Sequence, residues 1–158
     1  MKLYLAAPYA ARDYIRTVAA PKLAAAGHQM TSEWVLASRA ITPGTLGTSP
    51  ASSDAEVMYH AGKDLEEVKA ADVLLHFTAN YLVARTRLDP LRDNLHSGGR
   101  HVETGYALAH HKSVIYLGDP ENIFQRGLCH KARHLFDAVG ILAEMAEYDP
   151  DPRDPHRP

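Results

Sequence analysis

The chain of 158 residues contains one cysteine, Cys129, so no disulfide can form within it. It has no excess of basic residues, because 17 Lys and Arg are set against 19 Asp and Glu, for a formal net charge of −2. That balance argues against binding to a nucleic acid polymer, for which a basic surface is expected. No apolar run is long enough to cross a membrane, and the short apolar run before Pro8 lacks a signal-peptide pattern. These absences predict a cytoplasmic enzyme or binding protein without membrane contact, and they leave a small anionic substrate possible, because local fields matter more than net charge.

Several signatures of cofactor and metal enzymes are also missing. The chain has no G-x-G-x-x-G or P-loop pattern, and no G-x-S-x-G elbow of the kind found in serine hydrolases. Its histidines lack metal-binding spacing: His110 and His111 are adjacent and point in different directions on a helix. His130 and His134 are four apart, but no glutamate-containing zinc motif surrounds them. The sequence therefore predicts neither a metal ion nor a cofactor.

The most informative stretch that is present covers residues 97–107, which read SGGRHVETGYA. Gly98 and Gly99 let backbone N–H groups approach a ligand closely, and the helix expected after them adds partial positive charge. Together with Ser97, such a corner suits a phosphate or a hydroxyl group. A carboxylate beside it, Glu103, can attack a sugar carbon. The alternative is a tight turn capped by Ser97, with Glu103 as an ordinary helix charge.

The pattern along the chain alternates strands and helices. Apolar runs predict strands over residues 3–7, 28–35, 73–77, 113–117 and, more weakly, 132–136. Helical spacing predicts helices over residues 10–26, 54–71, 102–111 and 137–147. Pro21 is expected to divide the first of these, and Asp54 and Asp137 are expected to cap the second and the last. Two long segments, 37–53 and 80–96, are expected to be irregular.

This order predicts an α/β fold with an open, parallel, five-stranded sheet and helices on both faces. We expect a single domain over residues 1–148 and a disordered tail over 149–158, where proline alternates with charge. Ligands of such sheets bind beyond the carboxyl ends of the strands. Pro8, Thr78 and the segment before Glu103 all lie at that edge.

Two further residues are candidates for this site. Tyr4, on the first strand, can hydrogen-bond a carboxylate, although a buried strand tyrosine is more often simply part of the core. Asp64, on the second helix, can deliver a proton or contact a base edge, although a surface aspartate is the simpler interpretation.

With these residues identified, the chain resembles the nucleoside 2-deoxyribosyltransferase family, and most of all members from actinobacteria and their phages. The resemblance extends from the N-terminus to about Leu117, with the matching segments in family order. They are residues 2–8 (KLYLAAP), 62–72 (GKDLEEVKAAD), 99–107 (GRHVETGYA) and 112–118 (KSVIYLG), of which 99–107 is the specific one.

The resemblance implies a flavodoxin-like (Rossmann-like) sheet and a covalent glycosyl-enzyme mechanism. Glu103 matches the nucleophile, Tyr4 the tyrosine that positions it, and Asp64 the acid near the nucleobase. Transferases of the family often carry an acidic residue six positions before the nucleophile, whereas relatives that hydrolyse nucleoside 5′-monophosphates carry serine. This chain has Ser97 there, and a carboxylate would repel a phosphate. Arg12, after the first strand, can add positive charge.

The function expected from the resemblance is cleavage of the N-glycosidic bond of a nucleoside or deoxynucleoside 5′-monophosphate, through a glycosyl intermediate on Glu103. The close alternative is a 2-deoxyribosyltransferase that exchanges bases between deoxynucleosides. A more distant alternative is a non-catalytic nucleotide sensor, which would need no nucleophile. Because sites of this family often take a wall from a neighbouring subunit, a homodimer or larger homo-oligomer is expected.

Overall fold

A five-stranded parallel sheet in the order β2-β1-β3-β4-β5 forms the centre of the fold. The strands are β1 (Lys2–Ala6), β2 (Gln29–Met30), β3 (Val73–Phe77), β4 (Ser113–Leu117) and β5 (His130–Ala132). This computed structural model describes residues 1–36, 53–93, 95 and 98–147, so the expected tail and nearly all of the segment 37–53 lie outside the described residues. The strand order is that of flavodoxin-like sheets, as predicted.

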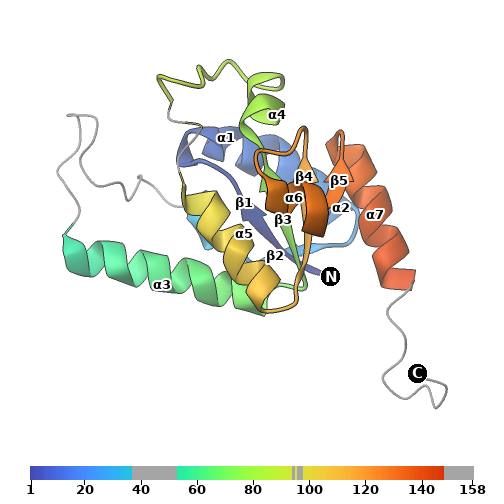
Figure 1. The fold of residues 1–158 in the computed structure, drawn as a ribbon, viewed down its shortest axis with the longest axis horizontal. Helices are drawn as coiled ribbons and strands as arrows, with labels where there is room; N and C mark the ends of the chain where they lie inside the picture. The colour runs from blue at the N-terminus through green and yellow to red at the C-terminus, as the bar shows by residue number, and fades with distance from the viewer. Residues whose placement is uncertain (37–52, 94, 96–97, 148–158) are drawn as a thin grey trace, which may run out of the picture.

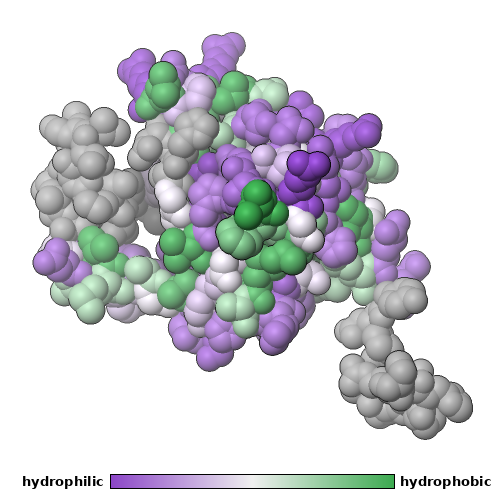
Figure 2. All heavy atoms as spheres, in the orientation of Figure 1, coloured by the Kyte–Doolittle hydropathy of each residue, from purple (hydrophilic) through white to green (hydrophobic). Residues whose placement is uncertain are grey.

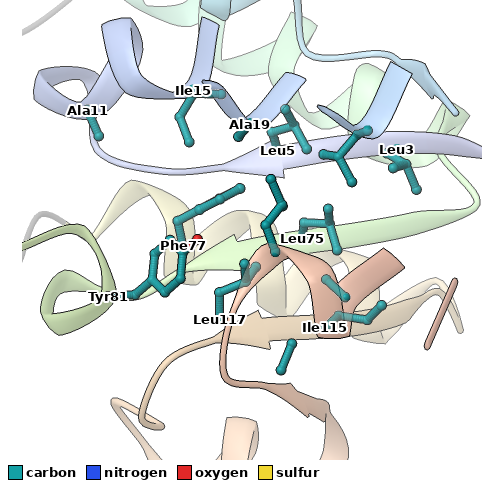
Figure 3. Packing of buried hydrophobic residues seen from close by; sticks show 14 of the residues in the cluster. Leu3, Leu5, Ala11, Ile15, Ala19, Leu75, Phe77, Tyr81, Ile115 and Leu117 are labelled. Carbon is teal, nitrogen blue, oxygen red and sulfur yellow. The ribbon is translucent and has the colours of Figure 1, made fainter. Parts of the chain in front are cut away.

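Helices cover both faces of the sheet (Figure 1). One face packs against η1 (Tyr9–Ala11), α1 (Arg12–Tyr14), η2 (Ile15–Ala19), α2 (Ala20–Ala25) and α7 (Leu135–Glu147). The other packs against α3 (Asp54–Ala70) and α5 (Gly99–Ala109). On the first face, Leu5, Ile15 and Leu75 interdigitate in the larger core cluster (Figure 3).

Strand alternation decides which side chains face α3 and α5. Tyr4 and Leu74 belong to the smaller core cluster with Val68 of α3 and Ala107 of α5. His76 follows Leu74 by two residues and therefore points to the same face. The alternation of side chains along a strand thus places the rings of Tyr4 and His76 on the sheet face that α5 covers.

The first helical segment is divided near Pro21, as predicted. A π-helical stretch, Ile15–Ala19, separates α1 from α2, and Pro21 lies in the first turn of α2. Proline has no N–H to donate to a carbonyl in the preceding turn, so the helix widens there.

The predicted strand over 28–35 was wrong beyond Met30. Thr31 still donates its N–H to Leu3, but the Ser32 hydroxyl accepts the N–H of Leu5 at 2.6 Å, in place of a backbone carbonyl. The chain then forms a 3-10 turn, η3 (Glu33–Leu36). Side-chain hydrogen bonds have replaced the strand ladder at this edge.

The predicted strand over 132–136 was also displaced, because β5 ends at Ala132 and α7 begins at Leu135. Asp137 is not the cap before this helix but lies in its first turn, where Oδ2 accepts the N–H of Arg133 at 3.0 Å. Similarly, Ser53 rather than Asp54 caps α3, accepting the N–H of Glu56.

One predicted helix starts earlier than expected, and two helices were not predicted. Helix α5 begins at Gly99 rather than at 102, because Gly98 is itself helical (φ −73°) and its carbonyl accepts the N–H of His101 at 2.9 Å. Short helices α4 (Ala79–Val83), within the segment expected to be irregular, and α6 (Ile123–Leu128) were not predicted. Each is capped by a side chain, Thr78 and Asn122 respectively, and is too short to show helical periodicity.

Exposed apolar side chains gather over α6 on the face shown in Figure 2, where Ile123, Phe124 and Leu128 are exposed. Across the described ranges, none of the helices combines the length and the apolar character that crossing a membrane requires.

Candidate active site

Glu103 and Tyr4 meet between α5 and β1. The Tyr4 hydroxyl donates a hydrogen bond to Glu103 Oε1 at 2.8 Å, although the two residues are 99 positions apart in sequence. Tyr4 is fully buried, whereas Glu103 is partly exposed. A rigid strand residue therefore holds one oxygen of a carboxylate that remains accessible.

The surroundings of Glu103 affect its pKa in opposite directions. Burial raises the pKa of Glu103 to about 7, while the hydrogen bond from Tyr4 and the charge of Arg100 act to lower it. Burial and the neighbouring Glu103 raise the pKa of Tyr4 far above its usual value, so the phenol stays protonated and keeps donating. The carboxylate is thus poised between its two charge states near neutral pH.

Helix α3 contributes two more carboxylates. Burial raises the pKa of Asp64, and the negative charge of Asp64 in turn disfavours ionisation of Tyr4 and Glu103. Glu67, one helical turn later, acts on the same two groups. Sequence reasoning singled out Asp64 and missed Glu67, although their i, i+3 spacing places both on one helix face.

Glu67 is held firmly. Its Oε2 accepts the N–H of Glu33 at 3.0 Å, while Oε1 is buried and has no hydrogen-bond partner among the described residues. Burial raises the pKa of Glu67, and the charge of Asp64 raises it further. Three carboxyl groups from α3 and α5 therefore act on the pKa of Tyr4, and one of them, Glu103, is hydrogen-bonded to its hydroxyl.

The two glycines of the motif lie at the start of α5, with Gly98 as its N-cap and Gly99 as its first residue. A Cβ at either position would meet no atom within 4 Å, so packing does not require glycine there. The opening leaves room for a ligand to approach the backbone. Ser97, the third member of the predicted phosphate corner, lies outside the described residues.

Pro8 and Arg12 both follow β1 in the chain. Pro8 is buried, and its carbonyl accepts the N–H of Ala11 at 2.9 Å. Arg12 donates to the Tyr9 hydroxyl at 2.7 Å and lies over that ring. The roles predicted for them in substrate binding stay predictions.

One cluster has the proximity of a metal site: ligand atoms of His76, His101 and Glu121 lie within 4.8 Å of one another. Arg100 already supplies the positive charge there, because its Nε lies 3.2 Å from both His76 Nε2 and Glu121 Oε2. A cation bound to those same atoms would be repelled by the guanidinium. We therefore assign the cluster to an ion pair, and sequence reasoning had missed all of its members.

No family model matches the chain, and no curated protein matches it in sequence. Solved structures do match. A 2-deoxyribosyltransferase from the psychrotolerant bacterium Bacillus psychrosaccharolyticus is 20% identical with a TM-score of 0.60, over 88% of this chain and 90% of that one. The CMP N-glycosidase BcmB of Clostridium botulinum is 17% identical with a TM-score of 0.48, over 91% and 99% of the two chains.

The similarity to the transferase is one of fold. It agrees with the open parallel sheet that the sequence predicted and extends over nearly the whole of both chains.

Proposed function

We propose that this chain cleaves the N-glycosidic bond of a nucleoside or deoxynucleoside 5′-monophosphate and releases the free base. The observation that carries the proposal is the hydrogen bond of 2.8 Å from Tyr4 to Glu103, which holds an accessible carboxylate beside β1. The fold shared with a 2-deoxyribosyltransferase supports chemistry at a glycosidic carbon.

In the first step, a Glu103 oxygen attacks C1′ while the bond from C1′ to the base nitrogen breaks, through an oxocarbenium-like state. The electron pair of the broken bond goes to the base, which takes a proton from Asp64 or from a water that Asp64 holds. In the second step, water attacks C1′, the ester bond to Glu103 breaks, and the proton of that water returns to the acid. The sugar phosphate leaves and both carboxyl groups regain their starting states.

The electrostatics suit these roles. The attack requires an ionised Glu103, and a pKa of about 7 makes the ionised form available at neutral pH. The raised pKa of Asp64 favours a carboxyl group that carries a proton to donate. No step requires a metal ion or a cofactor.

The alternative is base exchange between deoxynucleosides, in which a second base replaces water in the second step. The two reactions share the glycosyl intermediate and differ only in what releases it. The sequence favours hydrolysis of monophosphates, because Ser97 stands where an acidic residue would repel a phosphate.

The test is a panel of nucleosides and 5′-monophosphates, incubated with and without a second free base, with base release followed by chromatography. We expect monophosphates to release base without an acceptor, and the Glu103→Gln variant to lose at least about 100-fold in rate. Exchange of bases between free nucleosides would favour the transferase. A Glu103→Gln variant slowed only a few-fold would overturn the nucleophile assignment.

Substrate preference is predicted to depend on Ser97. Ser97→Asp should weaken use of monophosphates by at least about tenfold, because a carboxylate repels a phosphate, and should affect nucleosides far less. The measurement is kcat/KM for a matched monophosphate and nucleoside, with Ser97→Asn as the uncharged control of similar size. Equal losses on both substrates would remove Ser97 from the phosphate site.

We also propose that the active form is a homodimer or larger assembly, as the family resemblance implies.

A further inference from the structure

A buried ion pair anchors the first turn of α5. Arg100 is only 2% exposed, and its guanidinium donates to both oxygens of Glu121, from Nη2 to Oε1 at 2.7 Å and from Nε to Oε2 at 3.2 Å. Glu121 lies in the loop between β4 and α6. Two parallel bonds of this kind fix direction as well as distance, because the guanidinium and the carboxylate are both planar.

The same carboxylate is tied to two further elements. The N–H of Ala79, at the start of α4, donates to Glu121 Oε1 at 2.8 Å, and Nε2 of the fully buried His76 lies 2.9 Å from Oε2. On its other side the His76 ring meets the Thr104 hydroxyl at 2.8 Å. Hydrogen bonds from three sides hold the pKa of Glu121 at about 2, although burial alone would raise it.

The network contacts α5 at one residue before Glu103 in the sequence and at one residue after it. Arg100 and Thr104 are four residues apart and lie on one face of the helix, toward β3 and the loop. Glu103 lies between them and points to Tyr4. The rotation of α5 about its own axis, which decides where the Glu103 carboxylate lies, is therefore fixed by contacts that other residues of the helix make.

We propose that Arg100 is the positioning residue for Glu103: through Glu121, His76 and Thr104 it sets the rotation of α5 that brings the carboxylate to Tyr4. The inference rests on the proposed function and adds a residue to it. Arg100 acts through another side chain and is not itself a group that reacts.

Charge gives the proposal a second signature. The groups that act on the charge of Glu103 are Tyr4 from β1, Asp64 and Glu67 from α3, and Arg100 from α5 itself. Of these, Asp64 and Glu67 raise the pKa of Glu103, whereas Arg100 lowers it. Removing the charge of Arg100 should therefore raise the pKa of Glu103, and loss of the Tyr4 hydrogen bond on rotation of α5 would raise it further.

The test uses the double variant Arg100→Met/Glu121→Gln, which removes both charges and keeps the side-chain sizes. Buried ion pairs replaced as a pair commonly leave stability little changed, whereas loss of one partner leaves an uncompensated charge. The matched control is Asp119→Asn/Lys131→Met, which removes an exposed ion pair of 3.4 Å from the same loop and β5. Folding of each variant is checked by circular dichroism and thermal unfolding.

We expect the test variant to lose at least about tenfold in kcat with KM changed less than about threefold, and the acid limb of its pH profile to move to higher pH. The control should match the wild type in all three. A folded test variant with wild-type kcat and an unmoved acid limb would overturn the proposal.

A readout without turnover separates this inference from the proposed function. The pKa of Glu103 is measured by NMR in protein labelled at glutamate carboxyl carbons, with Glu103→Gln to assign the signal. The pKa of Glu103 should rise in the test variant and remain unchanged in the control. If the wild type releases no base from any compound, the proposed function fails, and the titration still decides on Arg100.

If the double variant does not fold, Arg100→Lys takes its place, since lysine keeps the charge but cannot form the two parallel bonds. Its kcat should fall, because a single ammonium group cannot fix the rotation of α5 as the two parallel bonds do. Wild-type kcat in Arg100→Lys would overturn the positioning role.

Discussion

At Glu103, the ionised form is disfavoured by burial and favoured by one phenolic hydrogen bond and one guanidinium. The Tyr4 hydroxyl can supply that bond at any physiological pH because its own pKa is raised far out of range. The balance between these influences, rather than the residue type, decides at which pH the carboxylate is ionised.

Tyr4→Phe keeps the buried ring and deletes the hydrogen bond to Glu103. The pKa of Glu103 should then rise above 7, so the acid limb of kcat/KM should move to higher pH by several tenths of a unit or more, with a moderate loss of rate. Tyr81→Phe is the control, because its hydroxyl meets Tyr14 at 3.0 Å, on the opposite face of the sheet. Identical profiles for the two variants would make Tyr4 a core residue.

Glu103→Gln should stabilise the fold at high pH. The pKa of Glu103 is about 7 in the folded chain against an unperturbed 4.5, so the folded state holds the proton more tightly. The stability that this proton provides is present below pH 4.5 and is lost as the pH rises through 7. The variant, which cannot ionise, should exceed the wild type by on the order of 3 kcal/mol at pH 8 and match it at pH 4.

Denaturant unfolding of Glu103→Gln at both pH values provides the measurement. A variant that gains nothing at pH 8 would show that Glu103 ionises freely in the folded state.

At the scale of elements, the turn after β4 depends on Gly118. This glycine has φ +100°, and a Cβ there would lie 2.5 Å from the Thr78 hydroxyl and 2.9 Å from Tyr81 Cβ. The hydroxyl of Thr78 is itself committed, because it donates to the carbonyl of Leu117 at 2.6 Å. The end of β4 and the start of α4 therefore approach too closely for any side chain.

Gly118→Ala should cost about 2–4 kcal/mol of stability, from backbone strain and overpacking together. Gly140→Ala is the matched control, since Gly140 lies in α7 with open space around its Cα, and alanine there should stabilise by up to about 1 kcal/mol. Thermal unfolding of both variants gives the comparison. A Gly118→Ala variant as stable as the wild type would mean that the turn relaxes easily.

The elements that the sequence predicted correctly are those with long, self-consistent patterns. The buried runs of β1, β3 and β4 and the long helix α3 were found because their periodicity is continuous. The end of β2 and the helices α4 and α6 were missed because single side-chain hydrogen bonds, such as that of Ser32 to Leu5, decide them.

The residues of the candidate site also divide into those with a local sequence pattern and those brought together only by the fold. The glycine pair and Glu103 are local in sequence, so a motif singles them out. Tyr4 and Asp64 were candidates from their places on a strand and a helix, and the resemblance gives them roles. Arg100 and Glu121 become partners only through the fold, since they lie on α5 and on the loop after β4. The sequence does not distinguish a buried arginine from an exposed one, because burial depends on a partner carboxylate that only the fold brings close.

At the scale of the whole molecule, the family resemblance found in the sequence leads to a prediction about oligomeric state. We predict a homodimer or larger oligomer, measured by sedimentation or light scattering across a dilution series, with specific activity followed in parallel. Specific activity should fall as the assembly dissociates, because the neighbouring subunit is expected to complete the site. A fully active monomer at every concentration would contradict this prediction.

The bond between Tyr4 and Glu103 spans 99 positions of sequence and joins the first strand to a helix two-thirds of the way along the chain. Closing so long a loop is among the slower events of folding, and local helices form well before it. During refolding, catalytic competence should therefore return later than helical signal. The time at which activity recovers would report when β1 joins the sheet. A chain arrested before that step would contain every residue of the proposed site without having formed it.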